Sequence, residues 1–337
     1  MENTVLAIAV STIDFLNSLE KTRLFKKLLS MERQGFLDAL AFVKSSSYGQ
    51  IAALAERNEK RPLRVRRWDG DEHVRLAKKS AAESKPLGVE CLLSDNPAFP
   101  ALLKEISDPP FALFYRGNIG VLGKKSVSVV GTRRLTPVGK RAARDFCYQA
   151  AAAGYCVVSG LALGADGAAH QGAVDAFYDA AAPVCSTAGV LAGGVDNIFP
   201  PSHKKMAGQI IQNGGVILSE WAPGVPGEKW RFVSRNRIIA GLAPATVVIQ
   251  APPGSGALLT ADFALGYNRE LFFHQACFEK NALVISNMVH KSLEAQEGAA
   301  AARKIATRPE SYVNDGASVI ASFEDFARNF EDGKIFP

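Results

Sequence analysis

The stretch from Ser126 to His170 constrains the fold more than any other part of this chain. It begins with an apolar segment (126–130) and a glycine turn, followed by an amphipathic segment. A second apolar segment (155–158) and a second glycine turn come next. This order predicts a βαβα unit whose two turns lie at the carboxyl ends of parallel strands, where doubly wound sheets bind ligands.

The amphipathic segment carries its own start and stop signals. Thr136 is a good N-cap, Pro137 suits the first helical position, and Gly154 can end the helix in a left-handed conformation. Four apolar residues recur at four-residue steps and form one stripe: Val138, Ala142, Phe146 and Ala150. We therefore expect a helix from about 137 to 152 that packs one face on a sheet.

From residue 88 onward, short apolar runs alternate with amphipathic segments, which is typical of an α/β fold with a doubly wound, mostly parallel sheet. Strands are expected at 112–115, 126–130, 155–158, 186–191, 216–219, 246–249 and 271–274. Special turns end consecutive strands at Gly131-Thr132-Arg133, Ser159-Gly160, Gly193-Gly194 and Pro252 to Gly256. We expect these turns to converge on one sheet edge and form one site.

The two ends of the chain depart from this alternation of apolar and amphipathic segments. Residues 1–60 show helical periodicity, and residues 61–85 are charge-rich, so we expect a helical N-terminal domain (1–85) of SAM or helix-hairpin type before the α/β domain (88–337). Residues 276–308 interrupt the α/β rhythm with a strand-like ALVIS (282–286) and an Ala-rich helix (289–306). A short strand or turn and a final helix capped by Ser322 follow.

Length and composition fit an ordinary globular protein of two domains, with 337 residues and 47% hydrophobic residues. Apolar runs are too short to span a bilayer, and the patch at 5–10 has neither a basic flank nor a cleavage site, so we expect a cytoplasmic protein without membrane contact. The five cysteines are scattered without CxxC or Cys/His spacing, which argues against disulfides and zinc and favours buried, reduced thiols.

Positive charge is concentrated at the N-terminus. Residues 1–87 contain 16 Lys and Arg against 11 Asp and Glu, whereas the remaining residues are nearly balanced. A basic region suits an anionic partner, and it equally suits a solvated surface. The segment with Arg64, Arg66, Arg67 and Trp68 has the composition of a nucleic-acid contact, but a solvated helix is the favoured interpretation.

The glycine turns are suited to phosphate. Small residues let backbone N–H groups approach an anion, and Arg133 and Arg134 add guanidinium groups directly after Gly131. The spacing of Gly160, Gly164 and Gly167 is not the dinucleotide motif, and no P-loop motif occurs. We therefore expect no cofactor and no metal.

Two further groups of residues allow more than one interpretation. Asp166 and His170 are four residues apart and could pair as a catalytic couple, but structural hydrogen bonding is favoured because no nucleophile elbow accompanies them. The segment Lys229 to Arg237 alternates cations with aromatics, which suits a single strand. Arg237 at its end is equally suited to pinning neighbouring loops.

Several of these segments together resemble the signature of the DNA-processing protein A family (DprA, also called Smf). They are VVGTR (129–133), VSGLALGADGAAH (158–170), AGGVDNIFP (192–200), LSE (218–220), SRNRIIAGL (234–242) and SGALLTA (255–261). Upstream, ISDPP (106–110) and FYRGN (114–118) resemble the family's entry into this domain. The resemblance covers residues 95–275 in order and without large gaps.

The resemblance implies an extended Rossmann domain that binds single-stranded DNA without sequence preference. It also implies a non-enzymatic homodimer that loads the RecA recombinase in transformation, competence and recombination. By motif position, DNA contacts fall on Arg133, on Asn197 and Phe199, and on Arg235 and Arg237. With the glycine turns, the expected interface comprises Gly131, Thr132, Arg133, Arg134, Ser159, Gly160, Asn197, Phe199, Arg235, Asn236, Arg237, Ser255 and Gly256.

The chain also departs from the family pattern. Gln250 stands where a Glu is usual, and the segment 268–275 is a degraded form of the family's next motif. The insertion at about 276–308 follows, and we expect no C-terminal winged helix of the kind that many relatives carry. These departures bear most on the dimer surface and on partner contacts.

The alternative function is a nucleotide-binding protein or a nucleoside-monophosphate phosphoribohydrolase-like enzyme on the same scaffold. The turn from Pro252 to Thr260 faintly resembles the phosphate turn of those enzymes, which need an acid on the following helix. Asp262 is the nearby carboxylate, but its register differs from theirs.

Overall fold

The computed structural model describes residues 2–35, 38–57, 68–296 and 298–332. Within these residues, nine strands form one sheet in the order β1-β2-β6-β5-β4-β3-β7-β8-β9. The strands are β1 (Glu90–Leu93), β2 (Ala112–Gly117), β3 (Ser126–Val130), β4 (Cys156–Ser159), β5 (Thr187–Val190), β6 (Val216–Ser219), β7 (Ala245–Val248), β8 (Glu270–His274) and β9 (Ser318–Ile320). Along this order, every two neighbouring strands between β6 and β9 are parallel, including β5, β4, β3, β7 and β8. Strand β2 pairs antiparallel with β1 and β6.

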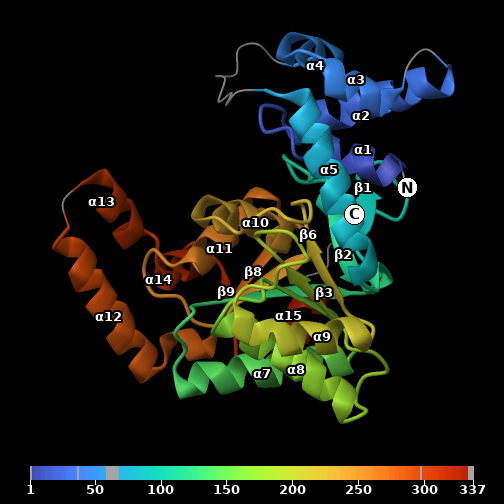
Figure 1. Ribbon diagram of the computed structural model, residues 1–337. Coiled ribbons are helices and arrows are strands. Elements are labelled where there is room, and N and C mark those ends of the chain that lie inside the picture. Colours follow the sequence, from blue (N-terminus) through green and yellow to red (C-terminus); the bar gives the residue numbers. More distant parts are fainter. Residues whose placement is uncertain (1, 36–37, 58–67, 297, 333–337) are drawn as a thin grey trace.

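Helices cover both faces of the sheet (Figure 1). They are α6 (Ala101–Lys104), α7 (Pro137–Ala152), α8 (Ala165–Tyr178), α9 (Lys204–Gln212), α10 (Lys229–Gly241), α11 (Gly256–Gly266), α14 (Pro309–Asn314) and α15 (Phe323–Asp332). Short 3₁₀ turns lie at η1 (Lys85–Leu87), η2 (Ile119–Gly123), η3 (Pro201–His203) and η4 (Gln275–Phe278). Buried clusters place α7, α8 and α15 on one face and α6, α10 and α11 on the other. The expected α/β fold with a mostly parallel, doubly wound sheet is confirmed.

Strand β3 shows how the sequence selects the two faces. Val127 and Val129 pack toward α7 and α8, and Val130 packs toward α10. Ser128 is fully buried on the α10 side, where its hydroxyl donates to the Ile239 carbonyl at 2.6 Å. The period-2 alternation of the strand therefore sends apolar side chains to one face and ties the other face to a helix.

The βαβα unit forms as the sequence predicts. The Thr136 hydroxyl accepts the Gly139 N–H at 3.1 Å, Pro137 opens α7, and Gly154 is left-handed with φ +84°. The predicted cap of the last helix is also present, because the Ser322 hydroxyl accepts the Asp325 N–H at 3.1 Å. Local capping signals were sufficient to locate both helices.

The N-terminal helices are α1 (Glu2–Ser11), α2 (Ser18–Arg33), α3 (Ala39–Ser45), α4 (Tyr48–Leu54) and α5 (Gly70–Ser84). The predicted junction near 85–88 coincides with η1 and with Gly88 at φ +67°. Buried residues of these helices, including Phe25, form one cluster with Phe111 and Ile217 of the sheet region. The helical region thus shares a core with the sheet, and its assignment to a SAM or helix-hairpin type stays a prediction.

The insertion differs from its prediction. Residues 282–286, expected as a strand, lie in α12 (Lys280–Glu294), which begins where the Glu279 side chain accepts the Asn281 and Ala282 N–H groups. The expected single helix 289–306 is divided, because α12 ends at Glu294 and α13 (Ala299–Ala306) begins after Gly298 at φ +112°. The strand expectation was wrong for two reasons. Glu279 starts a helix at this point, and β9 instead of residues 282–286 pairs with β8 in the sheet.

Two other differences concern short elements. Strand β1 was not predicted, and it pairs antiparallel with β2 at the sheet edge. The segment expected as a short strand or turn near 311–320 contains both α14 and β9. Strands of three or four residues carry too little periodicity for a sequence pattern to reveal them.

The five cysteines are free, as expected. Cys147, Cys156, Cys185 and Cys277 are buried, and burial raises the pKa of Cys156 and Cys185 to about 12. Among the described residues, no helix combines the length and apolar character needed to cross a membrane.

Candidate nucleic-acid interface

The four special turns meet at one edge of the sheet because β5, β4, β3 and β7 are direct neighbours in it. A cavity of about 690 Å³ opens beside them, between the turn after β3, helix α10 and the start of α11. Nine of the predicted interface residues line it: Gly131, Thr132, Arg133, Arg134, Phe199, Arg235, Asn236, Ser255 and Gly256. The predicted convergence on one sheet edge is therefore confirmed, whereas this cavity is lined by the turns after β3 and β7 and not by Ser159-Gly160 or Gly193-Gly194.

The Arg133 turn is fixed by backbone contacts. The Thr132 N–H donates to the Gln250 carbonyl at 2.7 Å, and the Thr132 carbonyl accepts the Ala165 N–H at 3.1 Å. Gly164 has φ +78°, and a Cβ there would lie 2.6 Å from the Arg133 Cα. Glycine at 164 thus allows the second turn to pack under the first and hold Arg133 in position.

The Arg133 side chain itself is exposed. It makes no ion pair with any described carboxylate, and its guanidinium lies 5.5 Å from the centre of the Phe232 ring. Arg134 is also exposed at the same turn. An exposed guanidinium stacked on a ring retains its donors for phosphate oxygens.

An aromatic pair lies beside Arg133. Phe199, 55% exposed, meets Phe232 edge to face with ring centres 5.8 Å apart. Exposed rings next to cations are the arrangement that proteins use to stack unpaired bases while phosphates are held nearby. Phe232 and Lys229 were not among the predicted interface residues, although the alternation of cations and aromatics in their segment was the signal for them.

The N-terminus of α7 is held to β7 by Gln250. Its amide oxygen accepts the Thr136 N–H at 3.0 Å, and its amide nitrogen donates to the Thr136 hydroxyl at 2.9 Å and to the Ala276 carbonyl at 2.8 Å. This buried amide has partners for both of its ends. Gln250 therefore joins the start of α7 to the chain after β7 and adds no negative charge beside Arg134.

Arg235 forms the floor of the cavity and is almost fully buried. It donates to the Val190 carbonyl at 2.5 Å, and a Cβ on Gly160 would lie 2.5 Å from both the Arg235 guanidinium carbon and the Asp166 carboxylate. Burial lowers the pKa of Arg235 to about 10 and raises that of Asp166, while their mutual attraction opposes both shifts. Arg235 thus organises the floor, and Gly160 provides the space for it.

Asp166 and His170 have separate partners. The Asp166 carboxylate accepts the Ala162 N–H at 3.3 Å, whereas the His170 Nδ1 lies 2.7 Å from the Thr187 hydroxyl. His170 is fully buried, and burial lowers its pKa to about 3. The structural interpretation of both residues, which the sequence favoured, agrees with these contacts.

Four predicted residues do not line the cavity. Ser159 is buried and donates to the Val129 carbonyl at 2.6 Å, Gly160 lies below Arg235, and Asn197 is exposed on the turn before Phe199. Arg237 lies in a different cavity.

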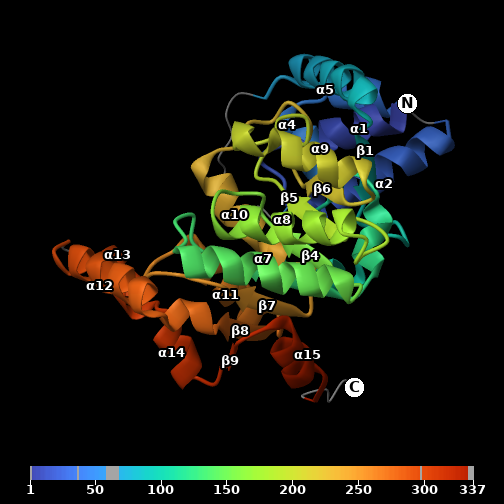
Figure 2. The ribbon, with the colours of Figure 1, turned by 90° about the horizontal axis from the view of Figure 1, so that it is seen from below.

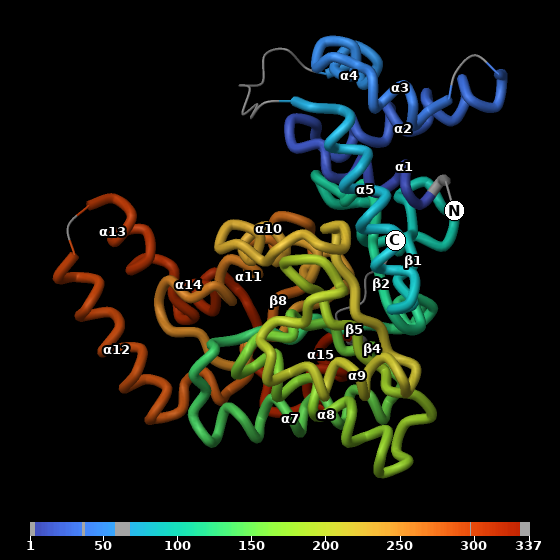
Figure 3. Tube along the Cα trace, viewed as in Figure 1, coloured from blue at the N-terminus to red at the C-terminus, as the bar shows by residue number. Residues whose placement is uncertain are grey.

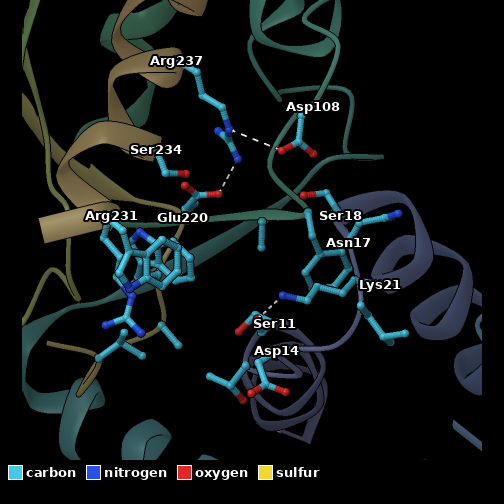
Figure 4. A pocket seen from close by; sticks show the side chains of 18 residues that line it. Ser11, Asp14, Asn17, Ser18, Lys21, Asp108, Glu220, Arg231, Ser234 and Arg237 are labelled. Atoms are coloured by element: carbon cyan, nitrogen blue, oxygen red, sulfur yellow. Dashed lines mark hydrogen bonds and ion pairs between the residues drawn. The ribbon is translucent and has the colours of Figure 1, made fainter. Parts of the chain in front are cut away.

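That second cavity, of about 360 Å³, lies between the N-terminal helices and α10 (Figure 4). Arg237 points into it from α10, donates to the Glu220 carboxylate at 2.5 Å, and lies 3.6 Å from Asp108. Across the cavity, Lys21 of α2 donates to the Ser11 carbonyl at 2.6 Å. Arg237 is therefore committed to a buried ion pair, which is the structural role the sequence left open for it.

Trp68 and Asp262, for which the sequence offered a nucleic-acid or a catalytic role, form contacts outside the cavity. The Trp68 indole N–H donates to the Ser46 carbonyl at 2.8 Å, and its ring contacts Phe15, so it packs inside the helical region. Arg64, Arg66 and Arg67 lie outside the described residues. Asp262, the acid of the enzymatic alternative, accepts the Tyr312 hydroxyl at 2.6 Å and does not line the cavity.

Comparison with known proteins adds sequence relatives. Protein Smf from Synechocystis is 40% identical over 185 residues, which are 54% of this chain and 44% of that protein. DNA processing protein DprA from Bacillus subtilis is 36% identical over 186 residues, 55% of this chain and 60% of that protein. The matched segment thus spans about half the length of these curated relatives.

Two solved structures share the fold. DNA processing protein A from Streptococcus pneumoniae aligns with a TM-score of 0.63 and 22% identity over 97% of each chain, which supports the fold alone. DNA processing protein A from Helicobacter pylori, described as having a unique single-stranded DNA binding mode, aligns with a TM-score of 0.56 and 25% identity. That alignment covers 72% of this chain and 96% of the other.

The sequence model of the family described as DNA recombination-mediator protein A matches residues 90–329, from the first strand of the sheet into the last helix. This range contains every motif on which the resemblance rested. The chain belongs to the DNA recombination-mediator protein A family.

Proposed function

We propose that this protein binds single-stranded DNA without sequence preference in the 690 Å³ cavity and takes part in DNA processing during transformation and recombination. The observation that carries the proposal is Arg133, an exposed guanidinium without an ion-pair partner in the described part of the chain, beside the Phe199–Phe232 ring pair. Phosphates pair with the exposed cations, and bases stack on the exposed ring.

The lining explains why binding is expected to tolerate sequence. Arg133, Arg134 and Lys229 offer charge at the rim, while Phe199 offers a ring face that any base can stack on. The relatives named DNA processing proteins and the Helicobacter pylori protein described by its single-stranded DNA binding mode support the same assignment.

The family relationship also supports three finer proposals. The bound strand is delivered to the RecA recombinase in the cytoplasm, the working form is a homodimer, and the protein performs no catalysis itself. RecA-dependent strand exchange with and without this protein tests the first, and sedimentation tests the second. Incubation with AMP tests the third, because release of free adenine would identify an enzyme.

The main experiment is a titration of fluorescent oligonucleotides across salt concentrations. We expect similar affinities for homopolymeric and mixed-sequence single strands, weak competition by duplex, and a log–log salt slope of about −0.7 for each phosphate contacted. Binding that is insensitive to salt, or displacement of the strand by a mononucleotide at equal concentration, would contradict the assignment.

A further inference from the structure

The inserted segment forms a helical projection beside the cavity. Helices α12 and α13, with Thr307 and Arg308 after them, are defined here as the arm, of which residue 297 is not described. Figures 1 and 2 both show the arm projecting from the body near the start of α7. The tube in Figure 3 shows the chain running out along α12 and returning along α13 to α14.

The arm contacts two of the turns that line the cavity. The Gly254 N–H donates to the Thr307 carbonyl at 3.2 Å, and a Cβ on Gly254 would lie 2.8 Å from the Cβ and Cγ of Lys304. The aliphatic stem of Lys304 therefore lies against the Pro252–Gly256 turn. At the base of the arm, Ile285 of α12 lines a small cavity together with Arg134.

The returning side of the arm carries three exposed cations, Arg303, Lys304 and Arg308. None of them forms an ion pair within the ranges that the structure describes. Glu294, the carboxylate among the described residues of the arm, faces His290 at 3.2 Å, and Glu279 just before the arm caps α12. The exposed Lys304 therefore lies against the same turn that lines the cavity together with Arg133 and Arg134.

The outgoing helix adds exposed apolar side chains. Val284 is 51% exposed and Met288 is 67% exposed, and both lie on α12. Apolar side chains beside a row of cations fit a ligand that has charged phosphates and flat, weakly polar bases. A nucleic-acid strand is the partner whose chemistry matches both features.

We propose that the arm is a second binding surface for the same single strand, which leaves the cavity over the Gly254 turn and continues along α13. Arg303, Lys304 and Arg308 neutralise phosphates outside the cavity, so the arm lengthens the occupied site. This inference rests on the proposed function. Arg303 and Lys304 also lie in the last turn of α13, where cations favour the helix dipole, so the test needs a readout that helix stability does not change.

The experiment compares the triple variant R303E/K304E/R308E with the unaltered chain on a short and a long oligothymidylate, of about 5 and about 20 nucleotides. For the long strand, we expect the magnitude of the salt slope to fall by about 0.7 for each phosphate that the arm no longer neutralises, and thus by up to about 2. Binding of the short strand, which the cavity alone accommodates, should change less than about twofold.

The matched control reverses three exposed cations on the N-terminal region, in R33E/K78E/K85E. It should leave both salt slopes unchanged, and a thermal melt should show all variants folded. An unchanged long-strand slope in the arm variant, an equal loss for both strand lengths, or an equal effect of the control would each overturn the role of the arm. If R133E leaves short-strand binding intact, the cavity assignment itself fails, so the two failures are distinguishable.

Discussion

Helix α10 borders two cavities, and an exposed arginine lies beside the first in addition to the buried Arg235. The open cavity lies against Lys229, Phe232, Val233 and Asn236, and beside it Arg133 is exposed. The second cavity lies against Trp230, Arg231, Ser234 and Arg237, and there Arg237 is buried against Glu220. Residues spaced by three or four positions share one side of a helix, so consecutive residues of one basic segment are divided between two environments.

The comparison shows that an arginine is available to a ligand only where no protein group already holds it. Arg231 illustrates the second case, because its guanidinium lies 4.8 Å from the Trp221 ring centre and 4.9 Å from that of Trp230, and it donates to the Pro226 carbonyl. The cation–aromatic alternation that predicted strand binding is used internally on this side of α10. On the other side, Phe232 meets Phe199 and Arg133 at the open cavity.

Removing the carboxylate of the buried pair should give the largest effect. Glu220→Ala leaves the buried Arg237 with only the more distant Asp108, so we expect the free energy of unfolding to fall by about 3 kcal/mol. Urea denaturation measures it. The matched control is Glu324→Ala, which breaks the exposed pair with Arg328 and should cost less than about 1 kcal/mol. Equal losses in the two variants would show that the buried Glu220–Arg237 pair contributes no more to the free energy of unfolding than an exposed ion pair.

Reversing the charge of the exposed Arg133 should weaken DNA binding and leave the free energy of unfolding almost unchanged. Arg133→Glu is expected to weaken single-strand binding by about tenfold to a hundredfold, or about 1.4 to 2.7 kcal/mol, because it removes a phosphate contact and adds repulsion. Unfolding should change by less than about 0.5 kcal/mol, since the side chain has no ion pair among the described residues. Anisotropy and urea denaturation measure the two quantities, with Arg33→Glu on α2 as the control. Unchanged affinity in Arg133→Glu would overturn the assignment of the open cavity as the binding site.

The buried His170 of α8 should make the free energy of unfolding depend on pH. Burial lowers the pKa of His170 to about 3, whereas the unfolded side chain titrates near its ordinary value of 6.5. The unfolded state therefore binds the extra proton first, and the free energy of unfolding falls as the pH drops below 6.5, by up to about 1.4 kcal/mol per pH unit. His170→Gln should flatten this slope between pH 6.5 and 4 in urea titrations. Parallel slopes in the two proteins would show that folding does not lower the pKa of His170.

Much of the fold was predictable because its signals are local. The cap at Thr136, the left-handed Gly154 and the apolar alternation of β3 depend on residues close in sequence, and each acted as predicted. The strand prediction for residues 282–286 was wrong because its signal is not local. A short run of apolar residues fits a strand or a helix, and the element that packs against it decides between them.

The sequence by itself determined which turns meet, since the carboxyl ends of neighbouring parallel strands necessarily share one edge. It also determined that Arg133 follows the first of them. Only the tertiary structure decided which cations remain exposed. Whether Arg237 meets a carboxylate, Arg235 a carbonyl, or Arg133 an aromatic ring depends on groups far away in the chain, whose approach no local pattern encodes.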